Sequence, residues 1–551
     1  MSHLVPHLRH LYQTISARSK FLGSLDTSQK SVRRFCIIIV LLIGLFFRFA
    51  NLDRKAYWRD EVDTSLRISG YTWTEVVQQV YDGRLLTPED LQTYQHPNPE
   101  KGLVDTLNSV AAEAFPHSPL YFILARFWAQ TFGNSVAVMR GLSALISLFT
   151  FPCLYWLCLE LFESPLVGWV AIALTSVSLF HVMYAQEARP YGLWIVTILL
   201  SSAALLRAMR CKTKLSWAVY AATLALGFYT FLLAGLVAVG HGIYVAATER
   251  VRLSSKILRD YLIASLAGFL AFTPWLFVLA NHINTSAKSV LNDQVPLPYL
   301  VQGWLINLSY TFLSVRFSSI WVILILIGYA ICFIFHKTSP RVWLFVLILI
   351  GVTPIALIVP DLIMGGKRSA IGRYLIPCYL GIQLAVAYLL TTQMFAGSVN
   401  IWRRKSWQLV AIALISVGIW SCIRFSQTEN GWNKGDFQNI PIARIINQSD
   451  APLVISDARF SETPTYIRLG SHYINFKSLV SFQSLIYNLA PNVGIQLVVE
   501  PNVPEIPETF SEVFLFNPST ALQDGIKKKY GYQEERLFTK AGISLWKLTK
   551  H

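Results

Sequence analysis

The chain has 551 residues, of which 54% are hydrophobic and only 14% are charged, and its mean hydropathy is +0.45. This composition excludes a soluble protein of that length and indicates a polytopic membrane protein. The formal net charge of +16 falls in short clusters between apolar runs, which is typical of membrane topology, so nucleic acid is not an expected partner.

The N-terminal segment 1–35 is basic and polar, and the apolar run after it lacks a small-residue cleavage site. We therefore expect a cytoplasmic segment followed by a retained first span. Apolar runs long enough to cross a hydrocarbon core of about 30 Å predict about eleven transmembrane helices. The predicted spans are 36–50, 136–161, 165–184, 190–207, 215–232, 234–248, 261–281, 319–336, 342–359, 374–396 and 407–424.

Basic loops predict the orientation of these spans. The clusters at 207–214, 249–260, 336–341 and 403–405 alternate along the chain as one face should, and the positive-inside rule makes that face cytoplasmic. The opposite, extracytoplasmic face then receives the following segments: a long loop 51–135, a turn 185–190, the segment 282–318, a turn 360–373, and everything after Arg424.

The first outer-face motif is "YWRDE", residues 57–61, directly after the first span. An acidic pair at such a place is commonly just the solvated end of a helix. Trp58, however, is suited to hold the loop at the bilayer surface, and nearby charges can tune Asp60. A carboxylate fixed at headgroup level suits a general base for a lipid-borne substrate, so Asp60 and Glu61 are the candidate catalytic residues.

The second motif is the turn "YAQEARPYG", residues 184–192, in which Glu187, Arg189 and Tyr191 are candidate substrate-binding residues. The alternative is a hairpin whose Glu and Arg simply pair with each other.

The third motif is "GGKRSAIGRYLIP", residues 365–377, with the cations Lys367, Arg368 and Arg373. Three cations on the face that should not be basic call for a counter-charge. Phosphate is the natural candidate, because guanidinium groups bind its oxygens bidentately. The motif therefore predicts a phosphate-binding site.

The segment 117–133 is apolar but too broken to be a clean span, and it predicts an interfacial or re-entrant helix. Such a helix could deliver His117 towards Asp60, or it could be an ordinary amphipathic stretch. A divalent metal ion could be held by Asp60, Glu61, Glu187 and His117, but no ligand spacing requires one. No cofactor is therefore assigned with certainty.

The tail 425–551 is polar and alternates β-rich runs with a helical pattern. The runs are "PLVISD", "HYINF", "IQLVVE", "EVFLF" and "ISLWKL", and the helical pattern is "STALQDGIKKKYG". The chain is thus expected to divide into the segment 1–35, a transmembrane domain 36–424 with its long outer loop, and an extracytoplasmic α/β domain 425–551.

These motifs place acids beside cations on one outer face, where a lipid phosphate is a more plausible substrate than a nucleotide. The chief alternative is a membrane transporter or lipid flippase. Transporters tend to place charges at mid-membrane and to show repeated halves, whereas here the charges lie at span ends. A non-catalytic receptor that binds its ligand with the outer tail is a further alternative.

An ordered set of motifs resembles a known family. "YWRDE", "HSPLYF", "MRGLSAL", "YAQEARPYGL", "ALGFYTFLLAGL" and "GRYLIPCYLG" resemble, in this order, the family 39-like glycosyltransferases of the GT-C superfamily. Relatives include the protein O-mannosyltransferases and the bacterial lipid A aminoarabinose transferase. The resemblance covers roughly residues 36–425. Members often read "HPPLYY" and "YTHY", whereas this chain has Ser118 and Phe231.

The resemblance implies a polyprenyl-phosphate-linked sugar donor, transfer with inversion, and a glycan, lipid or protein acceptor on the periplasmic side of a bacterial inner membrane. By the same resemblance Asp60 deprotonates the acceptor and Glu61 supports it. Glu187 and Arg189 then lie near the donor, and Arg373 faces the donor phosphate. The polar segment 71–116 would form a lid on the acceptor side.

Overall fold

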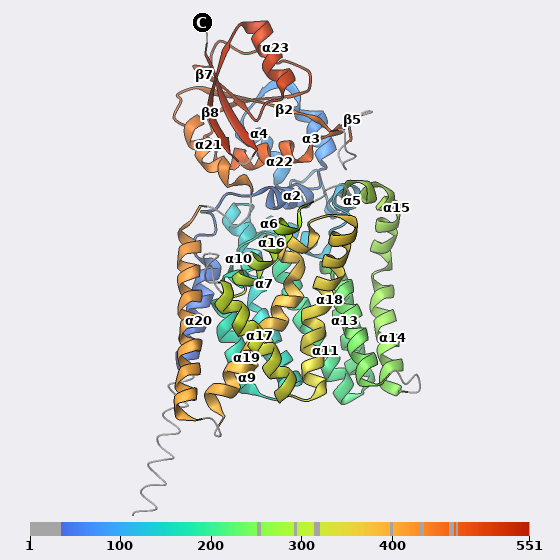
Figure 1. Ribbon diagram of the computed structural model, residues 1–551. Helices are drawn as coiled ribbons and strands as arrows, with labels where there is room; N and C mark the ends of the chain where they lie inside the picture. The colour runs from blue at the N-terminus through green and yellow to red at the C-terminus, as the bar shows by residue number, and fades with distance from the viewer. Residues whose placement is uncertain are drawn as a thin grey trace, which may run out of the picture.

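The computed structural model describes residues 35–250, 255–290, 295–312, 320–396, 400–429, 435–461, 468–469, 472–540 and 542–549. The predicted cytoplasmic segment 1–35, apart from its last residue, lies outside these ranges. A bundle of long helices forms one end of the molecule and a β-sheet region forms the other (Figure 1). The short helix α2 (Arg59–Ser69) lies between the two.

The bundle confirms a multi-pass integral membrane protein. Within the described ranges, six helices are long and apolar enough to cross a membrane, or up to eight if two bent pairs each form one span. All eleven predicted spans coincide with helices, but three of these helices are shorter than 18 residues, so the number eleven stays a prediction. The bundle helices are Phe35–Phe49, α7 (Val136–Leu148), α8 (Thr150–Phe162), α9 (Pro165–Ser176), α10 (Leu179–Ala185), α11 (Tyr191–Cys211), α12 (Lys214–Thr230), α13 (Ala234–Thr248), α14 (Lys256–Ala271), α15 (Thr273–Val290), α17 (Ile320–Lys337), α18 (Pro340–Met364), α19 (Ile376–Phe395) and α20 (Ile401–Gln427).

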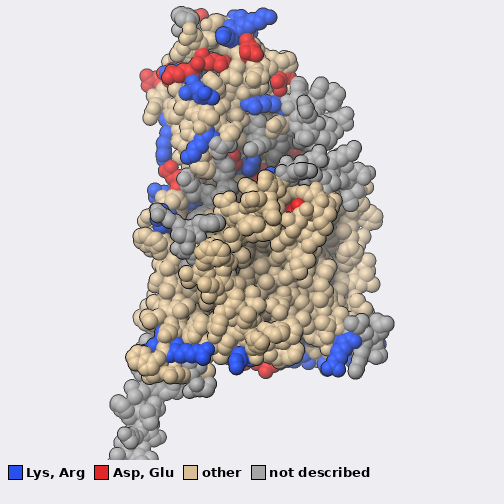
Figure 2. Space-filling model, in the orientation of Figure 1, with Lys and Arg blue, Asp and Glu red and all other residues tan. Residues whose placement is uncertain are grey.

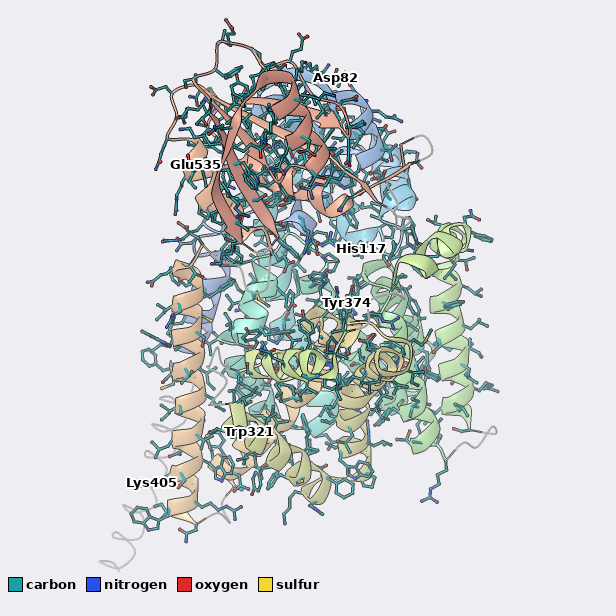
Figure 3. All side chains as sticks on the ribbon, turned by 45° about the horizontal axis from the view of Figure 1, so that its top comes forward. Asp82, His117, Trp321, Tyr374, Lys405 and Glu535 are labelled. Atoms are coloured by element: carbon teal, nitrogen blue, oxygen red, sulfur yellow. The ribbon has the colours of Figure 1, made fainter. Side chains whose placement is uncertain are left out.

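Charge is distributed as a membrane requires. On the face that Figure 2 shows, a broad belt of the bundle has almost no charged side chains, and basic side chains gather at the end away from the sheets. Lys405 lies at that end of the bundle (Figure 3). The belt matches the hydrocarbon layer, in which unpaired charges are costly.

A break between α9 and α10 bends this pair by 66°. At a break, backbone carbonyl groups lose their helical hydrogen bonds and need other donors inside a membrane. The buried Arg48 is such a donor, because its Nη1 donates to the Ser176 carbonyl at 2.8 Å. The thiol of Cys422 contacts the Val177 carbonyl at 3.4 Å. The bend redirects α10, which leads into the motif at 184–192.

The long outer loop 51–135 folds into short helices around a buried ion cluster. Arg67 Nη2 lies 2.9 Å from Asp63 Oδ1, and Arg67 Nη1 lies 2.8 Å from Glu113 Oε2. The indole of Trp73 also donates to Asp63, at 3.0 Å. The predicted helix within 117–133 is present as α6. The loop elements after α2 are α3 (Trp73–Val80), β1 (Asp82–Leu86), α4 (Pro88–Gln92), α5 (Leu103–Glu113) and α6 (Leu120–Phe132).

The C-terminal region contains a mixed six-stranded sheet in the order β1-β6-β2-β7-β9-β8. Strand β2 pairs in parallel with both β6 and β7, and the other pairs are antiparallel. The first strand, β1, comes from the outer loop, so the sheet joins segments far apart in the sequence. The elements are β2 (Pro452–Ala458), β6 (Gly494–Val499), β7 (Glu512–Phe516), α23 (Thr520–Tyr530), β8 (Gln533–Lys540) and β9 (Ile543–Thr549).

Three further strands form a separate small sheet, and two helices pack beneath the large one, facing α2 (Figure 1). All five β-rich runs of the tail contain strands, and the predicted helical pattern is α23; strand β8 was not predicted. The remaining elements are α21 (Asn439–Ile446), β3 (Phe460–Ser461), β4 (Arg468–Leu469), β5 (His472–Ile474) and α22 (Phe476–Leu485).

Candidate functional site

Glu61 of α2 contacts both α7 and the turn before α11, beneath the sheet region. Its side chain is fully buried, and both of its carboxylate oxygens accept from Arg140 of α7, at 2.8 and 2.6 Å. The backbone N–H of Ala188 donates to the same carboxylate at 2.9 Å. A bidentate buried pair of this kind fixes geometry, so Glu61 fastens α2 to α7 and to the turn before α11.

Asp60, the neighbouring residue on α2, has a different environment. Its side chain is 21% exposed, and its Oδ2 lies 3.5 Å from Nη2 of Arg373. Burial alone would raise the pKa of this carboxyl, but the positive charges of Arg373, Arg189 and Arg59 outweigh burial and hold the pKa below its usual value. Asp60 is therefore ionised at neutral pH, as a general base must be.

Arg189 connects Asp60 to His117. Its Nη1 donates to the Asp60 carbonyl and to Thr64 Oγ1, both at 3.0 Å, and its Nη2 lies 3.1 Å from Nε2 of His117. Burial, reinforced by the charge of Arg189, lowers the pKa of His117 to about 3. The imidazole is then neutral, and since guanidinium has no acceptor, Nε2 is the accepting nitrogen. His117 thus lies near Asp60, which is one of the two alternatives that the sequence left open.

Arg373 lies against three aromatic rings. Its guanidinium carbon is 5.8 Å from the ring centre of Trp58, 5.5 Å from that of Tyr191 and 5.6 Å from that of Tyr374. Rings at these distances attract a cation and restrict its movement. Tyr191 itself is buried. The guanidinium is consequently held beside Asp60 by contacts from α2, α11 and its own loop.

A cavity of about 570 Å³ opens on Arg373, and its lining is mixed polar and apolar. It lies at the junction between the helix bundle and the outer elements, where Figure 3 shows Tyr374 and, nearer the sheets, His117. Its size is that of a small-molecule site. The lining comprises Trp58, Arg59, Met183, Tyr184, Glu187, Tyr299, Gln302, Gly303, Ile306, Asn307, Tyr310, Lys367, Ala370, Ile371, Gly372 and Arg373.

Residues 116–277 match the model of a family described as dolichyl-phosphate-mannose-protein mannosyltransferase. The match confirms the resemblance carried by the sequence motifs. This chain is a glycosyltransferase, and over this segment it is similar to that family. The matched segment includes His117, Arg140, Glu187 and Arg189, whereas Asp60 and Arg373 lie outside it. No curated protein sequence matches the transferase closely enough to indicate kinship.

One solved structure shares the fold at low sequence identity, and two others are also similar to this chain. Apo ArnT from Cupriavidus metallidurans has a TM-score of 0.52 and 11% identity, with 94% of this chain and 98% of that chain covered. ArnT bound to undecaprenyl phosphate has a TM-score of 0.49 and 12% identity, with the same coverage. The oligosaccharyltransferase AglB from Archaeoglobus fulgidus, with an inhibitory peptide and a dolichol-phosphate, has a TM-score of 0.47 and 10% identity, covering 95% and 74%.

The three cations of the motif 365–377 do not all reach the cavity of the transferase. Lys367 and Arg373 line it. Arg368 lies outside the lining and pairs with Asp361 at the end of α18, its Nε being 2.9 Å from Asp361 Oδ1. Glu187 of the turn 184–192 is buried and lines the cavity. Two of the three predicted cations thus lie in the cavity wall.

Helix α16 (Leu297–Tyr310) provides site residues that the sequence motifs did not reveal. Tyr299, Gln302, Asn307 and Tyr310 line the cavity. The helix is fixed to the motif 365–377, because the Asn307 amide donates to the Ala370 carbonyl at 2.7 Å. The sequence did contain one signal for these site residues: amides and tyrosines occur in an otherwise apolar segment, and such polar groups seldom face lipid.

A metal site is not formed by the four predicted ligands. In the part of the chain that the structure describes, no group of three or more His, Cys, Asp or Glu side chains is arranged to hold a metal ion. Glu61 is engaged by Arg140, and His117 by Arg189. The candidate metal set from the sequence is therefore not assembled.

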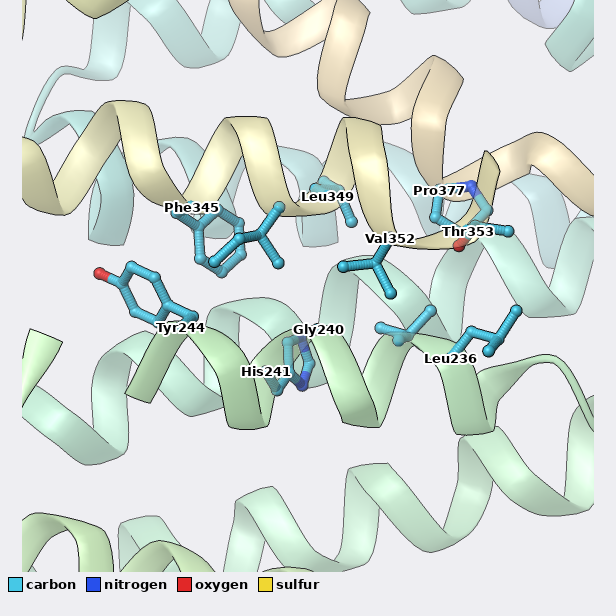
Figure 4. A pocket seen from close by; sticks show the side chains of 11 residues that line it. Leu236, Gly240, His241, Tyr244, Phe345, Leu349, Val352, Thr353 and Pro377 are labelled. Atoms are coloured by element: carbon cyan, nitrogen blue, oxygen red, sulfur yellow. The ribbon is translucent and has the colours of Figure 1, made fainter. Parts of the chain in front are cut away.

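A second cavity, of about 10 Å³, lies deep in the bundle between α13 and α18 (Figure 4). His241 and Tyr244 reach it from α13, and Phe345 from α18. This volume holds at most one water molecule. His241 is satisfied by Ser202 and Tyr220, each 3.2 Å away, so this cavity is part of the packing.

Proposed function

We propose that this transferase moves a sugar from a polyprenyl-phosphate donor to an acceptor hydroxyl on the extracytoplasmic face, with inversion and with Asp60 as the general base. The acceptor is a glycan, a lipid or a protein. The donor class follows from the matched family, whose description names dolichyl-phosphate-mannose. The bacterial inner membrane is the proposed location, with the active site and the C-terminal domain on the periplasmic side.

One observation carries this proposal: an ionised carboxylate lies at the edge of a cationic cavity. Arg373 both lines the cavity and approaches Asp60 to 3.5 Å. The cavity wall also contains Lys367 and Arg59. Cations positioned in advance stabilise negative charge that grows in the transition state. A donor phosphate in the cavity would therefore lie a short distance from the base.

The proposed step is one in-line displacement. The acceptor oxygen attacks the anomeric carbon, and the bond between that carbon and the phosphate oxygen breaks. The acceptor proton passes to the Asp60 carboxylate, and the lipid phosphate departs with its negative charge next to Arg373 and Lys367. Glu61 holds the start of α2 in place, while Glu187 and Tyr191 shape the donor side.

A donor-turnover assay tests the proposed activity against the transporter alternative. The purified protein is incubated with a panel of polyprenyl-phosphate sugars and candidate acceptors, and free polyprenyl phosphate is measured. We expect release that depends on the acceptor. Movement of the intact donor across a vesicle membrane, with no free polyprenyl phosphate released, would instead identify a flippase.

Arg373 and Arg368 form a matched pair of arginines for testing phosphate binding. We expect Arg373→Gln to raise the KM for the donor by about tenfold or more, because one charge-assisted contact to phosphate is worth about 1.5–3 kcal/mol. Arg368→Gln should leave that KM within about twofold, since Arg368 pairs with Asp361 outside the cavity. Steady-state kinetics with a short-chain donor measures both. Equal effects of the two variants would contradict the assignment.

Arg373→Gln is also expected to change the pH dependence of turnover. Cations lower the pKa of Asp60, so its base form is lost only when the pH falls through that lowered value. Removing the charge of Arg373 raises the pKa of Asp60 and moves this loss to higher pH. We expect the ratio of turnover at about pH 5 to turnover at about pH 7 to be smaller in Arg373→Gln than in the wild type. Each ratio is taken within one protein at saturating donor.

A further inference from the structure

The N-terminus of α2 is capped in part from within the helix, since Glu61 Oε2 accepts from the backbone N–H of Trp58 at 3.4 Å. Helix N-termini leave backbone N–H groups without intrahelical partners. The residue before the helix is Trp58, whose indole can donate but not accept. Ser, Thr, Asp or Asn would normally accept these N–H groups. The N–H of Arg59, the first residue of the helix, is one of the groups that an acceptor from another segment can bind.

Asp436, in the 3-10 turn Gly435–Gln438, supplies that acceptor. Its Oδ2 accepts from the backbone N–H of Arg59 at 2.8 Å, although 377 positions separate the two residues in sequence. The Asp436 side chain is only 3% exposed. A carboxylate at a helix N-terminus is also stabilised by the helix dipole. The contact gives the first N–H of α2 a carboxylate acceptor from the C-terminal region.

Other contacts from the same region hold the residues just before α2. Ser484, at the end of α22, donates to the Tyr57 carbonyl at 2.6 Å. The rings of Tyr57 and Tyr487 lie 4.7 Å apart. The C-terminal region thus contacts the residues on both sides of Trp58, at the start of α2.

We propose that Asp436 is a positioning residue: it caps α2 from the C-terminal domain and thereby sets where the Asp60 carboxylate lies. This inference rests on the proposed role of Asp60 as the base. It gives the C-terminal domain a part in the reaction that is separate from any acceptor binding. Misplacement of a reacting group by about 1 Å costs about a hundredfold in rate, so a cap next to the base has a large effect.

Rescue by the conservative variant separates capping from mere packing. Asn caps helices as well as Asp does, whereas Ala does not. We expect Asp436→Asn to keep at least about half of the turnover. Asp436→Ala should lose about tenfold to a hundredfold in turnover, with the donor KM within about twofold of the wild-type value. Amide hydrogen exchange of the peptide 57–62 should quicken in Asp436→Ala and not in Asp436→Asn.

An exposed carboxylate of the same domain, Asp524, provides the control, and Asp524→Asn should change neither turnover nor exchange. Equal loss in Asp436→Asn and Asp436→Ala would overturn the capping role, as would unchanged turnover and exchange in Asp436→Ala. Failure of the base assignment is distinguishable, because it would show as turnover in Asp60→Asn whatever the Asp436 variants do.

Discussion

Replacing Asp60 by Asn is expected to lower sugar transfer by about a thousandfold, the size of effect that a general base contributes. Asn keeps the shape of the side chain but cannot take the acceptor proton. The ion pair with Arg373, at 3.5 Å, lies at the edge of the cavity and is partly exposed, so its loss should cost little stability. Turnover of a short-chain polyprenyl-phosphate sugar by the purified variant is the measurement.

Asp82→Asn is the matched control for this experiment. Asp82 lies in the same outer loop, and its side chain is 51% exposed on β1. The control should keep wild-type turnover, and both variants should insert into membranes and unfold at the wild-type temperature. Near-normal turnover in Asp60→Asn would remove Asp60 from the mechanism.

Replacing Glu61 by Gln is expected to act mainly on stability. The substitution leaves the buried guanidinium of Arg140 without its counter-charge, and breaking a buried pair in this way costs about 3–5 kcal/mol. The amide can still accept from the Ala188 N–H, so local geometry is partly kept. We expect a clear fall in the thermal unfolding temperature of the purified protein, with loss of activity following from loss of folded protein.

Two further variants sharpen this prediction. Glu61→Gln combined with Arg140→Gln removes both charges, and it should recover part of the stability because no unpaired charge remains buried. Glu89→Gln, an exposed glutamate in the same loop, should leave unfolding unchanged. A Glu61→Gln protein with wild-type stability and no turnover would show instead that Glu61 acts directly in the reaction.

The different environments of Asp60 and Glu61 could not be predicted from the sequence. "YWRDE" presents Asp60 and Glu61 as one acidic pair, and the resemblance gives both to catalysis. Successive residues of a helix point about 100° apart, so Asp60 approaches Arg373 of the cavity wall while Glu61 faces α7. The direction in which each of the two side chains points depends on Arg140, which is 79 positions from Glu61 in the sequence.

The cations of the motif 365–377 are a second case in which the sequence does not reveal the contacts of each side chain. Composition and topology singled out 365–377, and Lys367 and Arg373 of this motif line the cavity. The positions of Lys367, Arg368 and Arg373 along the chain do not reveal that Arg368 is engaged by Asp361. The aromatic rings around Arg373 come from α2, α11 and its own loop, and only folding brings them together.

The sequence by itself determined the membrane class, the places of the helices and the resemblance to glycosyltransferases. These properties follow from apolar run length, from the positions of basic loops and from local motifs, which folding does not alter. Only the tertiary structure decided that α16 lines the cavity, that β1 joins the C-terminal sheet, and that Asp436 caps α2. The physical reason is range: each of these contacts joins segments distant in sequence, where hydrophobic periodicity and local propensity carry no information about partners.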